Sequence, residues 1–252
     1  MQPVDRLLDL SNSRVLVTGA GGNIGAAIAA RLAEAGASVA AHYRRDDARI
    51  ESLRRQYGRQ IIPVQADLSI DAEIDAMFEA LARADFSINA LVNNAADQSV
   101  AELATMPLQD WQQMMRTNVE AVLYICQRAL PLLQAGAVVN ISSIESLDPA
   151  VGHGHYAASK AALNMLTRAL ALESGPQNVR VNTVSPGLIH RSGIEDAWPE
   201  GVARWRERAP LGRLGEAADV ADAVLFLLSD MARWMSGANL VLDGGMNAQG
   251  KW

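Results

Sequence analysis

The stretch from Arg14 to Gly25 constrains the fold of this chain more than any other part of the sequence. Arg14 to Thr18 is a short, β-branched apolar run typical of a buried strand, and it passes through the turn TGAGGNIG into an alanine-rich segment with helical spacing. A glycine turn without any ligand would have similar residues. A strand before the turn and a helix after it favour a phosphate-binding βαβ unit, because glycines let the backbone approach a pyrophosphate that the helix N-terminus attracts. The residues expected to contact the phosphates are Gly19, Gly22, Asn23, Ile24 and Gly25.

The rest of the chain repeats this alternation of short strands and longer helices. Strands are predicted at residues 14–18, 38–43, 61–64, 88–92, 137–141, 179–184 and 239–242, and helices at 23–35, 46–57, 70–84, 108–133 and 155–173. Asp67 or Ser69 is a candidate cap for helix 70–84, and residues 187–201 are expected to be irregular, with two helices after them. Right-handed crossovers then predict an α/β fold, a doubly wound Rossmann fold of about seven parallel strands with helices on both faces. No linker or repeat divides residues 1–252, so a single domain is expected.

Composition excludes several classes of function. The net charge is −6, which opposes nonspecific nucleic-acid binding, and Cys126 is the one cysteine, so an intramolecular disulfide is impossible. No uncharged apolar run reaches the length of about 18 residues that a membrane span needs. The N-terminal residues lack the pattern of a signal peptide, and a cytoplasmic protein is expected.

Four residues in the second half of the chain form a pattern that carries chemistry. Tyr156 and Lys160 are spaced i and i+4 at the start of a predicted helix, which puts both side chains on one face. Ser143 precedes Tyr156 by 13 residues and follows a predicted strand, and Asn118 lies in the long helix before that strand. A surface tyrosine–lysine pair and a strand-end serine would explain parts of the pattern without catalysis. The four residues together, in this order, resemble the Asn-Ser-Tyr-Lys tetrad of the short-chain dehydrogenase/reductase family.

Other motifs support the same resemblance, from about Arg14 to Gly245. The glycine turn is similar to the family's Thr-Gly-x-x-x-Gly-x-Gly, with Asn23 at the middle glycine, where its side chain is expected near the phosphates. The segment from Asn93 to Ala96 is similar to Asn-Asn-Ala-Gly, which steadies the sheet and lines the cofactor, and Ala96 replaces its glycine. The resemblance further implies cofactor contacts from Asp67, Leu68, Asn94, Ala95, Pro186, Gly187 and Ile189, and from Tyr156 and Lys160.

The resemblance implies an oxidoreductase that interconverts a carbonyl and a secondary alcohol. Tyr156 is then the general acid or base, with a pKa lowered by the Lys160 ammonium and by oxidised nicotinamide. Ser143 would hydrogen-bond the reacting oxygen, Lys160 would hold the nicotinamide ribose, and Asn118 would anchor a water path to Lys160.

The end of the second strand bears on the choice between NAD and NADP(H). Tyr43 stands where NAD-dependent relatives have an acidic residue, and Arg44 and Arg45 follow it. A guanidinium suits a 2′-phosphate, so NADP(H) is the predicted cofactor. The alternative is a solvated basic turn balanced by Asp46 and Asp47.

The substrate side is less defined by sequence. Glu145, His153, His190 and Trp198 are the candidate pocket residues, and residues 187–215 form the variable segment that covers the substrate in relatives. His153 and His155 could equally be ordinary loop residues, and no metal site is expected because no acidic or cysteine cluster completes one. A small-molecule carbonyl or alcohol substrate and a homotetramer are expected. A 3-oxoacyl-thioester reductase is the rival enzyme, and a non-catalytic NADP(H)-binding sensor or scaffold is the alternative from another class.

Overall fold

The computed structural model describes residues 3–45 and 48–248, which form a seven-stranded parallel sheet in the order β3-β2-β1-β4-β5-β6-β7. The strands are β1 (Arg14–Val17), β2 (Ser38–Tyr43), β3 (Ile61–Gln65), β4 (Ala90–Asn93), β5 (Ala137–Ile141), β6 (Arg180–Pro186) and β7 (Asn239–Leu242). The order reverses between β1 and β4, as in a doubly wound fold. The predicted fold class is confirmed.

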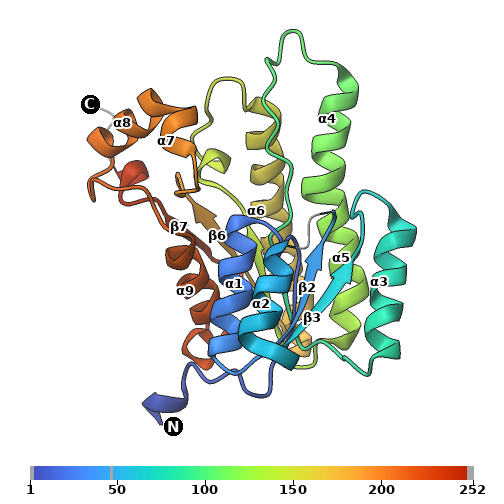
Figure 1. The fold of residues 1–252 in the computed structure, drawn as a ribbon. Helices are drawn as coiled ribbons and strands as arrows, with labels where there is room; N and C mark the ends of the chain where they lie inside the picture. Colours follow the sequence, from blue (N-terminus) through green and yellow to red (C-terminus); the bar gives the residue numbers. More distant parts are fainter. Residues whose placement is uncertain (1–2, 46–47, 249–252) are drawn as a thin grey trace.

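Helices cover both faces of the sheet (Figure 1). They are α1 (Asn23–Glu34), α2 (Ala48–Tyr57), α3 (Asp71–Arg83), α4 (Leu108–Met115), α5 (Ala121–Ala129), α6 (Gly154–Ser174), α7 (Ile194–Ala197), α8 (Pro199–Arg208) and α9 (Ala217–Leu228). Within the predicted helix 46–57, Asp46 and Asp47 lie outside the described residues.

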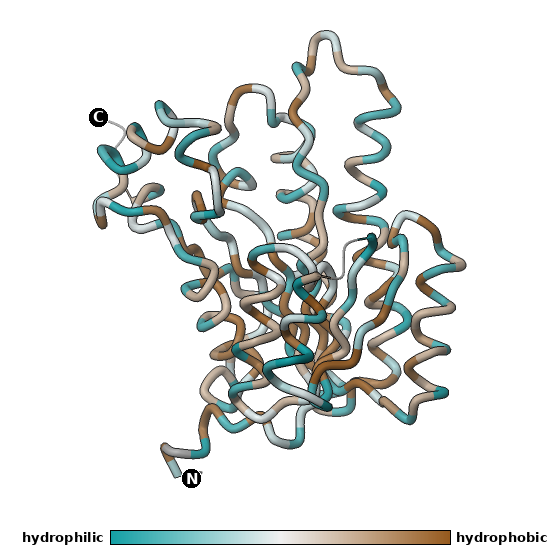
Figure 2. Tube along the Cα trace, viewed as in Figure 1, coloured by the Kyte–Doolittle hydropathy of each residue, from teal (hydrophilic) through white to brown (hydrophobic). Residues whose placement is uncertain are grey.

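Alternation along the strands divides the core into two layers. In β1, Val15 and Val17 pack with residues of α1, α2 and α9, whereas Leu16 between them packs with residues of α3, α5 and α6. This follows from the pleat, which turns successive side chains to opposite faces. Figure 2 shows hydrophobic residues concentrated along the central strands. Both faces are buried, which explains why these strands are nearly continuous apolar runs.

The turns after β1 and β4 are joined at the point where the strand order reverses. Thr18 Oγ1 accepts hydrogen bonds from the backbone N–H groups of Asn94 (2.9 Å) and Ala95 (3.1 Å). The Asn94 side chain donates to the carbonyl of Thr18 at 2.9 Å. These bonds fix the two carboxyl-end turns against each other, so a ligand at this crevice would meet a rigid edge.

A buried row of polar side chains fixes α6 against three strands. Asn93 on β4 donates to Asn140 on β5 at 2.8 Å, and Asn140 donates to Thr167 on α6 at 2.8 Å. Thr183 on β6 completes the row through Thr167 at 2.9 Å. Asn93 Oδ1 has no partner among the described residues, but the three hydrogen bonds of the row hold α6 in a fixed position relative to the strand ends.

Three local expectations were wrong. Ile70 is the N-cap of α3 and no side chain caps this helix, because the Asp67 carboxylate instead accepts from Ser69 N and Oγ. The segment 187–201 is not irregular throughout, since it contains α7 and the start of α8. The helix predicted at 108–133 is interrupted by a π-helical turn at Arg116–Glu120 and ends in a 3-10 turn at Leu130–Leu132.

Candidate active site

The glycine turn between β1 and α1 brings the backbone of three segments close together. Gly19 has φ +67°, and a Cβ built on it would lie 2.9 Å from the Cα of Ala95. A Cβ on Gly25 would lie 2.2 Å from the Gly19 carbonyl oxygen, so only glycine lets α1 approach the turn this closely. Gly22 caps α1 without any side-chain hydrogen bond, which leaves the first N–H groups of this helix open to an anion.

His42 supports the glycine turn by a hydrogen bond, and this role was not predicted from the sequence. It is buried on β2, where Nδ1 accepts from the Gly19 N–H at 3.0 Å and Nε2 lies 3.0 Å from the Ala66 carbonyl. The N–H of Gly19 can only donate, which assigns the proton to Nε2. Burial lowers the pKa of His42, against smaller opposing contributions from the Ala66 bond and the charge of Asp67. The ring therefore holds the turn as a neutral imidazole.

Asn23 stands at a glycine position of the family pattern, but its backbone does not have a positive φ. It is the first residue of α1 and has a helical backbone, while Gly19 takes the left-handed conformation. Its side chain donates to the backbone carbonyl of His190 at 2.8 Å. The residue expected beside the phosphates thus connects the glycine turn to the start of the segment 187–215.

The end of β2 presents two exposed arginines beside an acid. Arg44 and Arg45 follow the half-buried Tyr43, and neither has a side-chain partner in the described part of the chain. The pKa of Asp67 is lowered, mainly by its hydrogen bonds from Ser69 and further by the nearby charges of Arg44 and Arg45. Asp46 and Asp47, which could have balanced the arginines, lie outside the described residues.

Arg49 on α2 is a further cation near the turn that sequence reasoning did not single out. Its guanidinium donates to the carbonyl of Gly21 at 3.0 Å. In the sequence, the one indication of this role was that Arg49 lies in a predicted helix, six residues after Tyr43. The cationic surface thus extends from the end of β2 to the glycine turn.

Lys160 lies beneath Tyr156, as the i, i+4 spacing predicted. Its ammonium is 5.6 Å from the centre of the Tyr156 ring and donates to the Ile141 carbonyl at 2.8 Å. Lys160 is 2 % exposed, and burial lowers its pKa to about 8. The side chain is therefore fixed by the end of β5 and faces the ring rather than the phenolic oxygen.

The predicted lowering of the Tyr156 pKa is wrong for the chain by itself. Burial raises this pKa, and hydrogen bonds from Gln98 and Ser143 only partly oppose it. The physical reason is that a buried phenolate loses hydration, while the Lys160 ammonium is bound to Ile141 and does not reach the phenolic oxygen.

Ser143 and Gln98 both lie at the phenolic oxygen. Gln98, from the loop after β4, donates its Nε2 to Tyr156 Oη at 3.0 Å. Ser143 lies at the end of β5, and its Oγ accepts from the backbone N–H of Glu145 at 3.1 Å. Sequence reasoning predicted Ser143 here and missed Gln98. The one feature of the sequence that could have indicated this role is that Gln98 lies shortly after the end of a predicted strand.

Asn118 lies at the centre of the π-helical turn and is buried. Its Oδ1 accepts from the N–H of Asp97 (2.8 Å), and its Nδ2 donates to the carbonyl of Asp97 and to Ser159 Oγ (both 3.0 Å). Ser159 in turn donates to the Tyr156 carbonyl at 2.7 Å. The four predicted tetrad residues are therefore brought to one place, with Asn118 joined to α6 through Ser159.

Two of the candidate pocket residues lie beside Tyr156. His153 Nδ1 is 3.0 Å from a carboxylate oxygen of Glu145, and its ring stands edge-on to the Tyr156 ring with centroids 6.1 Å apart. His155, by contrast, is fully buried, and neither ring nitrogen has a partner among the described residues. His155 therefore does not line an open pocket.

The other two candidates are not brought to Tyr156 by any described hydrogen bond or ring contact. His190 lies at the base of the segment 187–215, where its N–H donates to Gly215 at 2.7 Å and its ring is 3.7 Å from Glu216. Trp198 packs over Gly201, between α7 and α8, and remains half exposed. Both residues make these contacts within or next to the segment 187–215.

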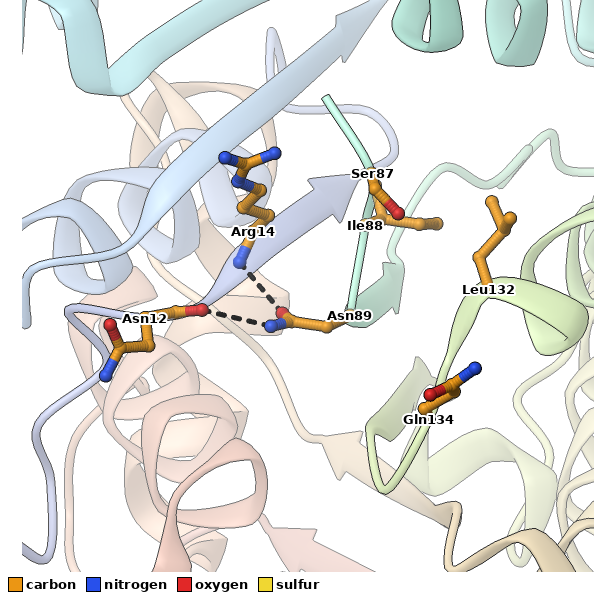
Figure 3. Close-up of a pocket in the computed structure, with 7 residues that line it drawn as sticks. All are labelled: Asn12, Arg14, Ser87, Ile88, Asn89, Leu132 and Gln134. Atoms are coloured by element: carbon orange, nitrogen blue, oxygen red, sulfur yellow. Dashed lines mark hydrogen bonds between the residues drawn. The ribbon is translucent and has the colours of Figure 1, made fainter. Parts of the chain in front are cut away.

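A separate pocket lies at the amino ends of β1 and β4 (Figure 3). The side chain of Asn89 in this pocket is already paired, since it accepts from Arg14 N at 2.8 Å and donates to the Asn12 carbonyl at 3.0 Å. Ligands of doubly wound folds bind at the other end of the strands. This pocket is therefore no part of the candidate site.

The described residues lack both a metal-binding cluster and a membrane-spanning helix. They contain no group of three or more His, Cys, Asp or Glu side chains able to hold a metal ion. None of the helices they form combines the length and the apolar character needed to cross a bilayer.

Comparisons with known proteins agree with this geometry. Residues 19–247 match the sequence model of a family described as enoyl-(acyl carrier protein) reductase. The chain is 34 % identical over 247 residues to 3beta-hydroxysteroid dehydrogenase 1 of Eggerthella lenta, covering 94 % of this chain and 95 % of that protein. It is 37 % identical over 248 residues to L-xylulose reductase of Caenorhabditis elegans, covering 95 % and 97 %. A gluconate 5-dehydrogenase from Burkholderia cenocepacia, solved in complex with NADP and tartrate, has a TM-score of 0.89 at 28 % identity and covers 97 % of this chain and 98 % of its own.

Proposed function

The chain belongs to the short-chain dehydrogenase/reductase family and is an oxidoreductase acting on CH–OH and C=O groups, and we propose that it uses NADP(H) with Tyr156 as general acid and base. The observation that carries this proposal is the set of polar groups around the phenolic oxygen and ring of Tyr156. Ser143 and Gln98 hydrogen-bond it, and Lys160 lies under its ring, close to the edge of the sheet where the glycine turn lies.

When bound, NADPH would supply the hydride for reduction and NADP+ would accept it for oxidation. In the reducing direction Tyr156 donates its phenolic proton to the carbonyl oxygen of the substrate, and in the oxidising direction it accepts the alcohol proton. Ser143 hydrogen-bonds the same substrate oxygen and stabilises the charge that develops on it. Lys160, whose ammonium lies 5.6 Å from the centre of the Tyr156 ring, would hold a ribose hydroxyl of the bound cofactor. Asn118 holds the loop and helix that carry Gln98 and Tyr156.

The preference for NADP(H) over NAD(H) is supported by the end of β2. Arg44 and Arg45 leave two exposed guanidinium groups beside the glycine turn, and Tyr43 provides no carboxylate to bind a ribose 2′-hydroxyl. Fluorescence titration with NADPH and NADH tests this, with NADPH expected to bind at least tenfold more tightly. Arg44→Ala should weaken NADPH binding and leave NADH binding nearly unchanged. Tighter NADH binding by the native chain would overturn the assignment.

The role of Tyr156 is tested by Tyr156→Phe. Removal of a general acid should lower kcat by about 10² to 10⁴, while the affinity for NADPH stays within a few-fold. Undiminished turnover of a ketone would contradict the role. The rival non-catalytic sensor predicts that the native chain binds NADPH but reduces no ketone, and the complete tetrad argues against it.

We also propose a homotetramer in the cytoplasm. Met165 and Leu172 on α6 are large apolar side chains that are 60 % and 81 % exposed in the single chain, which fits burial of this helix against another copy. Light scattering that finds a stable monomer would contradict the proposed assembly.

A further inference from the structure

We infer that the polar groups around Tyr156 select a small, uncharged ketone with a hydroxyl group on the carbon next to the carbonyl. This inference rests on the proposed function and adds to it a substrate class and three residues that recognise it: Gln98, Glu145 and His153. All three lie near the oxygen at which the reaction occurs.

Gln98 supplies the first polar contact. Its Nε2 donates to Tyr156 Oη at 3.0 Å, which leaves Oε1 without a partner among the described residues. The loop that carries it is fixed, because the neighbouring Asp97 is bound through its N–H and its carbonyl to Asn118. A hydroxyl next to the substrate carbonyl would place its O–H where this amide oxygen can accept it.

Glu145 and His153 together supply the second polar contact. Their side chains are only 21 % and 28 % exposed, and the carboxylate lies 3.0 Å from Nδ1 of the ring. A carboxylate only accepts hydrogen bonds, so Nδ1 carries a proton, and Nε2 has no partner within the described part of the chain. The position of Glu145 is fixed by its own N–H, which donates to Ser143 Oγ at 3.1 Å.

These groups discriminate between the substrate classes considered. An acyl chain or a steroid ring next to the carbonyl would cover Gln98, Glu145 and His153 without replacing their hydrogen bonds to water, which costs binding free energy. A carboxylate in the same place would be repelled by Glu145. A hydroxyl group can donate and accept, and it carries no charge.

An opposing feature lies at the rim. Val100 is 68 % exposed and packs toward Gly152 in the loop before α6, and Leu103 is 61 % exposed and packs toward Gly154 at the start of α6. They would favour an apolar substrate if they decided selectivity. The hydrogen-bonding groups contact Tyr156 directly, so they decide the selectivity.

A matched set of four-carbon ketones tests the inference with NADPH as reductant. 3-Hydroxy-2-butanone and 1-hydroxy-2-butanone should exceed 2-butanone in kcat/KM by roughly 10- to 100-fold, and 3-oxobutanoate should be the poorest substrate. Gln98→Leu and His153→Phe should reduce the hydroxy-ketone preference to a few-fold. Gln134→Leu is the matched control, because Gln134 is exposed at the amino end of the sheet and should leave the preference unchanged.

The outcomes separate this inference from the proposed function. If the native enzyme reduces 2-butanone as well as the hydroxy ketones, or prefers 3-oxobutanoate or a steroid ketone, the substrate class is wrong and the proposed function stands. If the preference persists in both Gln98→Leu and His153→Phe, these residues do not carry it and the inference is overturned. If no ketone is reduced, the proposed function fails and this inference fails with it.

Discussion

The Asn118 side chain forms two hydrogen bonds with Asp97, accepting from its N–H at 2.8 Å and donating to its carbonyl at 3.0 Å. The amide thus pairs with the backbone as a neighbouring strand would. It can do so because the π-helical turn at Arg116–Glu120 places Asn118 against the loop after β4. Because Asn118 also donates to Ser159 on α6, these hydrogen bonds hold the loop that carries Gln98 against α6.

Asn118→Asp should disrupt this pair with almost no change in shape. The carboxylate can still accept from Asp97 N but cannot donate to the Asp97 carbonyl or to Ser159, so the free energy of unfolding should fall by about 1–3 kcal/mol. A displacement of the loop should also lower kcat by about 10². Chemical denaturation and steady-state kinetics measure both effects. Asn12→Asp makes the same change at an exposed residue whose side chain has no described partner and should do neither; equal effects at the two positions would refute the role of Asn118.

Gly25→Ala should damage the cofactor site. Its Cβ would lie 2.2 Å from the Gly19 carbonyl oxygen and 2.6 Å from the Asn94 amide, so the glycine turn must shift. We expect a loss of about 1–3 kcal/mol in stability and at least a tenfold weaker affinity for NADPH. Gly175→Ala is the control, because its φ is −54° and no atom lies within 4 Å of the added Cβ. Undisturbed NADPH binding by Gly25→Ala would show that the turn does not hold the phosphates.

Asn23→Gly should loosen the covering segment. The variant loses the hydrogen bond to the His190 carbonyl, which is worth about 1 kcal/mol, so the base of segment 187–215 should open roughly fivefold more often. Limited trypsin digestion measures this as faster cleavage after arginines of the segment, such as Arg191. A cleavage rate equal to that of the native chain would mean that Asn23 does not restrain the segment.

Lys160 should make the free energy of unfolding depend on pH in the alkaline range. Burial lowers its pKa from 10.5 to about 8, so between these pH values the unfolded chain binds a proton that the folded chain has released. The penalty for the buried charge is complete below about pH 8 and disappears as the pH approaches 10.5. Relative to Lys160→Met, the native protein should therefore gain up to about 3 kcal/mol over this range. A constant difference between the two proteins in urea unfolding at pH 7.5 and pH 10 would contradict the lowered pKa.

The fold was largely predictable from local signals. The strands are β-branched apolar runs, the helices have a period of 3.6 residues, and glycine at the first turn fixes how β1 meets α1. Strands β2, β5 and β7 begin and end at the predicted residues. The limits of α3 and the π-helical turn at Arg116–Glu120 were not predictable, because both depend on hydrogen bonds with neighbours that sequence periodicity does not reveal.

The sequence by itself determined which residues can do the chemistry, since Tyr156 and Lys160 share one face of a helix by spacing alone and Ser143 follows a strand. Only the tertiary structure decided which groups surround them. Gln98, His42 and the Ile141 carbonyl reach the site from distant parts of the chain, and burial raises the pKa of Tyr156 although Lys160 is close. The physical reason is that helical spacing is a local property, whereas desolvation and long-range hydrogen bonds exist only once the strands and helices have packed.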